Sequence, residues 1–144
     1  MSSNAKSKNK SGSLAKIPSL KQETIMHYSA FVKRIKELET LTASMTPKPS
    51  IFVIFSGNYT SGPNGKSWCG LCNAVYDFVN REIVWSYAEP GYLLWVRVGD
   101  QEEWTDPDNP FRKDPKINIK SIPAAIKWGT EKKLEGFHMA IGVP

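Results

Sequence analysis

Residues 51–72 have the sequence IFVIFSGNYTSGPNGKSWCGLC and contain both cysteines of the chain. Residues 51–55 are a continuous apolar run, typical of a strand buried on both faces of an α/β sheet. Residues 56–66 are rich in Gly, Asn, Ser, Thr and Pro and indicate a loop. From Cys69 to Ile83, apolar residues recur at helical spacing. The stretch therefore predicts a central strand, a loop, and a helix with Cys69 and Cys72 in its first turn.

The residues before this strand predict a helix over 20–41. Ser19-Leu20-Lys21-Gln22 has the form of a capping box. Apolar residues then follow at helical spacing: Ile25, Tyr28, Phe31, Val32, Ile35, Leu38 and Leu41. Pro47 and Pro49 end the predicted helix because each lacks an N–H donor and pushes its predecessor out of helical geometry.

The residues after the cysteines complete an α/β pattern. Residues 92–98 form a second apolar strand run, and the Asp- and Pro-rich segment 106–110 indicates turns or a short irregular helix. Residues 124–128 and 132–134 flank Gly129-Thr130-Glu131 and predict a β-hairpin. The predicted order is helix, strand, helix, strand and hairpin, an α/β domain with a mixed sheet and no internal repeat.

Length and charge indicate one domain with a basic tail. The chain has 144 residues and a net charge of +5, and four lysines without any acidic residue stand in residues 1–16. The remainder has 15 basic against 14 acidic residues, so its charge does not favour nucleic-acid binding. We expect a disordered tail over 1–18 and a folded domain over 19–144. With no apolar run for a membrane span or signal peptide, we expect no membrane association and a cytoplasmic location.

The Cys-x-x-Cys spacing indicates redox or metal chemistry. At a helix N-terminus, exposed N–H groups favour a thiolate, which makes Cys69 the predicted nucleophile. Cys72 lies on the same helix face and could attack a mixed disulfide formed by Cys69. The alternative is zinc, but the only other soft ligands are His27 and His138, which are far from the cysteines in sequence. We therefore expect no metal and no bound cofactor.

Two further positions are candidates for substrate contact. Trp68 could be a core aromatic, but directly before a reactive cysteine it is better placed to contact a docking polypeptide. Ile122-Pro123 begins the third predicted strand, where a proline cannot donate to a sheet. From spacing alone, an ordinary strand-start proline is the favoured interpretation, and a cis bond is the alternative.

Several groups of residues together resemble one known family. They are Gly65-Lys66-Ser67-Trp68-Cys69, Val98-Gly99 ahead of Trp104, Asp106-Pro107 with Asn109, Phe111-Arg112-Lys113 and Trp128-Gly129-Thr130. The chain resembles the thioredoxin fold and, more closely, the cytosolic thioredoxin-related family called thioredoxin domain-containing protein 17. The resemblance runs from the first helix to about Leu134.

The resemblance implies a protein-disulfide reductase. It implies dithiol–disulfide exchange on disulfide-containing proteins or small disulfides, recycling by NADPH through a thioredoxin reductase, and, more weakly, peroxide removal. It also implies that Pro123 is the cis-proline facing the dithiol and that the backbone of Ile122 pairs with an extended substrate. Trp68, Ile122 and Pro123 are therefore the predicted substrate-binding residues, beside catalytic Cys69 and Cys72.

The chain departs from this family at two places. Gly70-Leu71 stands between the cysteines where the family has Pro-Asp, which keeps open a second function, an interaction module with low turnover. Residues 136–144 replace most of the family's C-terminal helix, so we expect a shortened helix there. Poor cover of the sheet, truncation and dimerisation are the alternatives, and we expect a monomer.

Deleting residues 1–16 should leave both the thermal midpoint and the exchange rate unchanged. These residues have almost no apolar surface to offset an ordering cost of about 1–2 kcal/mol per residue. Calorimetry and a disulfide-reduction assay on the full and shortened chains would test this. A clear drop in either quantity would show that the tail docks on the domain.

Overall fold

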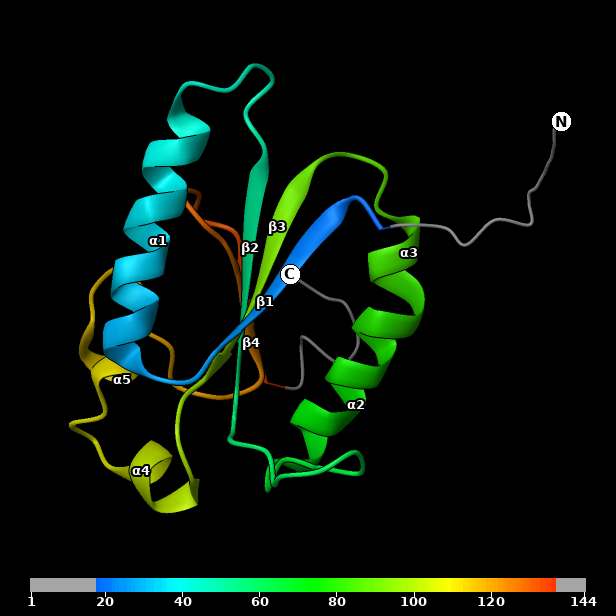
Figure 1. Ribbon diagram of the computed structural model, residues 1–144. Coiled ribbons are helices and arrows are strands. Elements are labelled where there is room, and N and C mark those ends of the chain that lie inside the picture. The colour runs from blue at the N-terminus through cyan, green and yellow to red at the C-terminus, as the bar shows by residue number, and fades with distance from the viewer. Residues whose placement is uncertain (1–17, 137–144) are drawn as a thin grey trace, which may run out of the picture.

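The computed structural model describes residues 18–136, in which helices cover both faces of one five-stranded sheet (Figure 1). The strands are β1 (Leu20–Ile25), β2 (Ser50–Ser56), β3 (Gly91–Arg97), β4 (Ala124–Lys127) and β5 (Lys133–Glu135). The helices are α1 (Tyr28–Ala43), α2 (Gly70–Phe78), the π-helical turn η1 (Val79–Ile83), α3 (Val84–Ser86), α4 (Gln101–Thr105) and α5 (Pro110–Lys113). The predicted mixed α/β sheet is confirmed.

β2 is the central strand, as its continuous apolar run predicts. The sheet order is β1-β3-β2-β4-β5, with β1 and β2 parallel to β3. β4 is antiparallel to both β2 and β5, so the predicted hairpin over 124–134 is present. Phe55 near the end of β2 pairs with Val96 on one side and with Ala124 on the other.

The predicted start of the first helix was wrong. Residues Leu20–Ile25 are a strand that pairs with Gly91–Val96, and α1 begins only at Tyr28. The expected cap residue Ser19 instead donates its hydroxyl to the carbonyl of Ala88. Pairing with β3 satisfies the backbone groups on one side of this edge strand and buries Leu20 and Ile25, an advantage that the local sequence pattern does not reveal.

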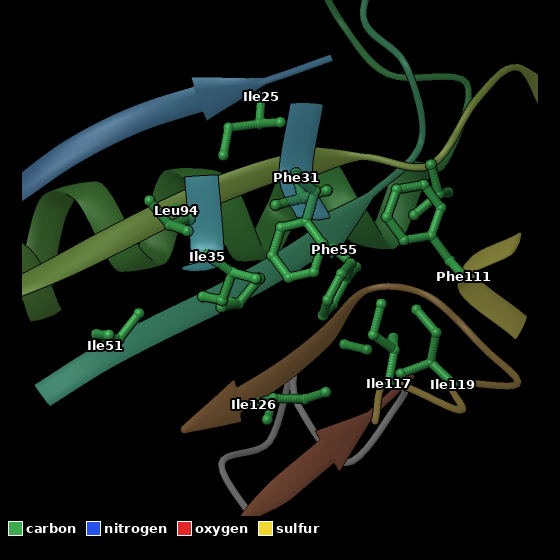
Figure 2. Close-up of a cluster of buried hydrophobic side chains, with 14 of the residues drawn as sticks. Ile25, Phe31, Ile35, Ile51, Phe55, Leu94, Phe111, Ile117, Ile119 and Ile126 are labelled. Atoms are coloured by element: carbon green, nitrogen blue, oxygen red, sulfur yellow. The ribbon is translucent and has the colours of Figure 1, made fainter. Parts of the chain in front are cut away.

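On one face of the sheet, α1 and α5 pack over a core of aliphatic side chains with a group of phenylalanines among them (Figure 2). Phe31 of α1 contacts Phe55 of β2 edge-on, with ring centroids 5.7 Å apart, and Phe111 of α5 also lies 5.7 Å from Phe55. Leu41, expected on the apolar face of the first helix, is instead 51% exposed, because the buried face continues through Thr42.

The other face is covered by the helical segment that follows the cysteines. Val75, Val79 and Val84 pack against Leu93 and Trp95 of β3. The helix predicted as far as Ile83 is present, with a π-helical turn in its second half and a final turn that reaches Ser86. Residues of β3 alternate between the two cores, as expected for a strand buried on both faces.

The segment 106–110, expected to hold turns or a short irregular helix, links α4 to α5, and Asn109 is the N-cap residue of α5. The buried Asn109 amide donates to the carbonyls of Val98 and Glu103, and its oxygen accepts from the N–H of Phe111. One side chain thus ties the end of β3 to α4 and α5.

Some predictions lie outside the described residues. They include the basic tail as far as residue 17 and the shortened C-terminal helix beyond Gly136. Within residues 18–136, no helix is both long and apolar enough to cross a membrane.

Candidate active site

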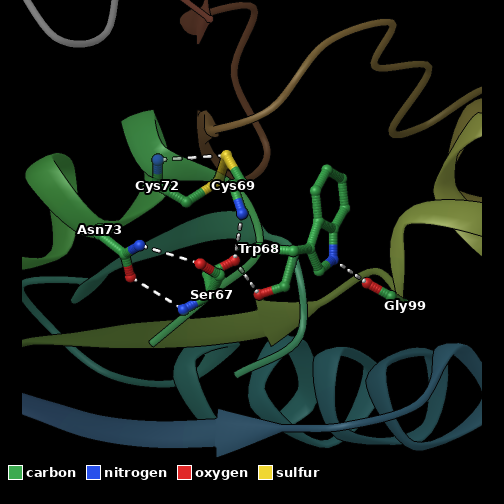
Figure 3. Close-up of a disulfide and its surroundings, with 7 residues drawn as sticks. Ser67, Trp68, Cys69, Cys72, Asn73 and Gly99 are labelled. Carbon is green, nitrogen blue, oxygen red and sulfur yellow. Dashed lines mark hydrogen bonds between the residues drawn. A yellow bond between two sulfur atoms is a disulfide. The ribbon is translucent and has the colours of Figure 1, made fainter. Parts of the chain in front are cut away.

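Cys69 and Cys72 form a disulfide at the N-terminus of α2, with their Cα atoms 5.2 Å apart (Figure 3). Cys69 is the N-cap residue in an extended conformation, and its sulfur accepts a hydrogen bond of 3.2 Å from the N–H of Cys72. Cys72 is buried, with 1% of its surface exposed, whereas Cys69 is partly exposed. The two sulfur-bearing residues are therefore unequal in access to solvent.

Ser67 fixes the chain immediately before the cysteine (Figure 3). Its buried hydroxyl donates to the carbonyl of Gly57, at 3.0 Å, and accepts from the N–H of Cys69, at 3.1 Å. The side-chain oxygen of Asn73 accepts from the N–H of Ser67, and the Asn73 amide donates to the Ser67 carbonyl. The end of β2, the loop and the first turn of α2 are thus held together by one serine and one asparagine.

Sequence reasoning missed Ser67 and Asn73 as parts of the site. A serine two residues before Cys69 and an asparagine four residues after it are the available signal, because both types form local hydrogen bonds with backbone near helix ends. That signal is weak without a structure, since the same residues are common in any loop.

Trp68 lies beside the disulfide as a partly exposed aromatic side chain, 37% of its surface being accessible. Its indole Nε1 donates to the carbonyl of Gly99, at 3.0 Å (Figure 3). The ring lies directly over Gly57, where an added Cβ would be only 2.6 Å from ring atom Cε2. Gly57 therefore has to be a glycine for the indole to occupy this position.

Ile122 and Pro123 lie at the same end of the sheet as the disulfide. The Ile122–Pro123 peptide bond is cis, and Pro123 is fully buried. β4 begins at the next residue, Ala124, which pairs with Phe55 at the end of β2 from which the loop to Cys69 departs. The antiparallel pairing of β4 with β2 brings this proline to that end.

Glu135 of β5 holds the loop that leads into the cis-proline. Its Oε1 accepts from the N–H groups of Lys120 and Ser121, at 2.7 and 3.0 Å. Burial raises the pKa of Glu135, but these two backbone hydrogen bonds and the charge of Lys133 outweigh burial and leave the pKa below its ordinary value. Lys133 also donates to the carbonyl of Asn118, so β5 holds the loop at two points.

Neither histidine joins the cysteines in what the structure describes. His27 is an exposed N-cap residue of α1, and His138 lies outside the described residues. Residues 18–136 contain no group of three or more His, Cys, Asp or Glu side chains that could hold a metal ion.

The sheet order, the disulfide at a helix N-terminus and the cis-proline before an antiparallel strand define a thioredoxin-like domain. Comparison with known proteins agrees. The thioredoxin domain of the thioredoxin domain-containing protein 17-like family matches residues 24–141. The chain therefore belongs to this family.

Individual relatives show the same affiliation. Thioredoxin domain-containing protein 17 of Mus musculus is 33% identical over 111 residues, which cover 77% of this chain and 80% of the mouse protein. Its Homo sapiens counterpart is 36% identical over 85 residues, or 59% of this chain and 65% of the human protein. Thioredoxin-like protein Clot of Oryza sativa subsp. japonica is 32% identical over 69 residues, or 45% of this chain and 49% of the rice protein.

Replacing Glu135 with Gln should lower the free energy of unfolding at pH 7 by about 1 kcal/mol, because a neutral amide oxygen replaces the charged acceptor of the two loop N–H groups. The loss is small because the carboxylate is partly exposed to solvent. A carboxyl with a lowered folded-state pKa stabilises the fold above its unfolded pKa and loses that effect as pH falls through the folded value. The difference between wild type and variant should therefore shrink between pH 5 and about pH 3. Urea denaturation at both pH values measures it.

The matched control is Glu131→Gln in the exposed hairpin turn, which should change stability little at either pH. A Glu135→Gln difference that is equal at pH 7 and pH 3 would show that the carboxylate charge is not what holds the loop.

Proposed function

We propose that the chain is a protein-disulfide reductase that performs dithiol–disulfide exchange through Cys69 and Cys72. The observation that supports this most is the unequal exposure of the pair at the start of α2. Cys69 is partly exposed, whereas Cys72 is buried beneath it. A substrate disulfide can approach Cys69 from solvent, and Cys72 is within bonding distance for the second step.

In the reduced protein, Cys69 is the group whose thiolate the site favours. The N–H of Cys72 points at its sulfur, and the positive end of the α2 dipole lies there. The first turn of α2 has no acidic residue to oppose that charge, since Gly70 and Leu71 are neutral. A lowered thiol pKa raises the fraction of the reactive form at neutral pH.

The exchange transfers two electrons and two protons to the substrate. The Cys69 thiolate attacks one substrate sulfur, the substrate disulfide breaks, and the leaving thiolate takes a proton from water. Cys72 then loses its proton to water and attacks the Cys69 sulfur of the mixed disulfide. The second substrate sulfur leaves as a thiolate and is protonated, and the Cys69–Cys72 disulfide remains.

We assign Trp68, Ile122 and Pro123 to the substrate-binding site: Trp68 and the backbone of Ile122 would contact the substrate, and Pro123, whose side chain is buried, would position that backbone. A groove of about 400 Å³ lies beside Trp68 and is lined by Tyr59, Lys66 and Gln101 among others. An extended peptide that pairs with the backbone before Pro123 would lie across the same end of the sheet as Trp68.

The oxidised protein has to be reduced again for turnover. We propose thioredoxin reductase as the partner and NADPH as the electron source, in the cytoplasm, where thiols are kept reduced. A peroxide is a second, slower substrate. The Cys69 thiolate attacks one peroxide oxygen, the O–O bond breaks, and the other oxygen leaves as hydroxide or alkoxide and is protonated. Cys72 then attacks the sulfur of the resulting Cys69 sulfenic acid, which closes the disulfide and releases water.

The experiment that tests this function is reduction of a disulfide reporter peptide with NADPH and thioredoxin reductase. We expect NADPH consumption that depends on the chain and saturates with reporter. The competing function, an interaction module with low turnover, predicts that partner proteins bind while NADPH consumption stays at the level of the reductase alone. That result would overturn the proposal.

The two single cysteine variants should behave differently. Cys69→Ser should abolish exchange, whereas Cys72→Ser should accumulate a mixed disulfide between Cys69 and the reporter, because the resolving thiol is absent. Non-reducing mass spectrometry detects the adduct and its position. If the Cys69→Ser protein instead traps the reporter through Cys72, the assigned roles are reversed.

A further inference from the structure

A pocket of about 630 Å³ lies next to the disulfide site without including either cysteine, Trp68 or Pro123. Its walls come from the loop 59–66, from Asn73, Tyr76 and Asp77 of α2, and from Arg97 at the end of β3. The loop and the end of β3 lie at the same end of the sheet (Figure 1). A volume of this size is typical of sites for small organic molecules.

Arg97 is a half-buried cation without a counter-ion in this pocket. Its guanidinium stacks on the ring of Tyr59, with the central carbon 3.9 Å from the ring centroid. Among residues 18–136, no ion pair or hydrogen bond is made by this guanidinium, and its Nε atom is buried without a partner. Burial lowers the pKa of Arg97, although a guanidinium stays charged at neutral pH.

This arrangement leaves the donors of Arg97 in need of an acceptor. The ring of Tyr59 covers one face of the Arg97 guanidinium. The N–H groups of the guanidinium lie in its own plane and are directed away from its centre, so the ring does not accept their hydrogen bonds. Partly burying a charge without a partner costs free energy. An anion that pairs with Arg97 in the pocket would offset this cost.

The neighbouring groups favour a phosphate-like acceptor. The Tyr59 hydroxyl is also buried without a partner, and burial raises its pKa, so it remains a donor. Lys66 adds a second positive charge at the loop, and Asp77 is the one carboxylate that lines the pocket. The balance of these charged side chains is positive.

We propose that this pocket binds a small organic molecule that bears a phosphate or sulfate group, with Arg97 as the main anion ligand. The phosphate or sulfate group pairs with Arg97 and Lys66, and the organic part fills the remaining volume against Tyr59 and Tyr76. The pocket contains neither cysteine, but it adjoins the groove beside Trp68, with which it shares Tyr59 and Lys66.

The test is a titration of the oxidised full chain at constant ionic strength, followed by ¹H–¹⁵N correlation spectra and calorimetry. The probes are inorganic phosphate, phenyl phosphate and phenol. We expect saturable shifts confined to residues 59–66, 73–77 and 97. Phenyl phosphate should bind more tightly than inorganic phosphate, and phenol should not bind. Because no electron transfer is measured, this result is independent of the reductase assay.

Arg97→Gln should weaken phenyl phosphate binding by about ten-fold, since a charge-assisted pair is lost. Arg81→Gln is the matched control on an exposed arginine outside the pocket and should leave the affinity within about two-fold. If circular dichroism shows that Arg97→Gln is unfolded, the exposed Lys66→Gln serves instead, with an expected loss of about three-fold.

Three results would overturn the proposal: shifts that do not saturate, shifts that cluster elsewhere, or unchanged affinity in a folded Arg97→Gln protein. If inorganic phosphate binds as tightly as phenyl phosphate, the claim that an organic group contributes to binding is overturned. Phenol binding as tightly as phenyl phosphate would overturn the role of the anion.

Discussion

The pairing of Phe55 with both Val96 and Ala124 is the constraint on which the rest of the structure depends. This pairing makes β2 a central strand whose C-terminal end is buried. The chain leaves the sheet at that end through the loop that leads to Cys69. The same pairing sets β4 antiparallel beside β2 and brings the start of β4 to that end. Cys69 and the cis-proline Pro123, 54 residues apart in sequence, consequently lie at the same end of the sheet.

Most of the fold could be predicted because the strong sequence signals coincide with buried elements. The apolar runs at 51–55 and 92–98 correspond to β2 and β3, and the hairpin lies where Gly129 predicts a turn. Leu20–Ile25 could not be predicted, because its partner is more than 60 residues away and its own pattern continues the periodicity of α1. A parallel edge strand has no local signal of its own.

The cysteine pair of the candidate site could also be predicted, but its supporting residues could not. Spacing alone places Cys69 and Cys72 on the first turn of a helix. The glycine beneath Trp68 and the carboxylate of Glu135 act across the fold, at separations of 11 residues and of 14 to 15 residues. Such contacts depend on the relative positions of loops in the folded structure, which no local pattern of residue types determines.

The Trp68 indole illustrates what such support does for recognition. The ring rests on Gly57 and is tethered through Nε1 to the carbonyl of Gly99, so it has little rotational freedom left in the free protein. An aromatic side chain normally loses conformational entropy when a partner immobilises it, which subtracts from the affinity. Here that loss has already occurred during folding. If Trp68 contacts substrate as we propose, a docking polypeptide would meet a preorganised surface, and less of the contact free energy would be lost to ordering the indole.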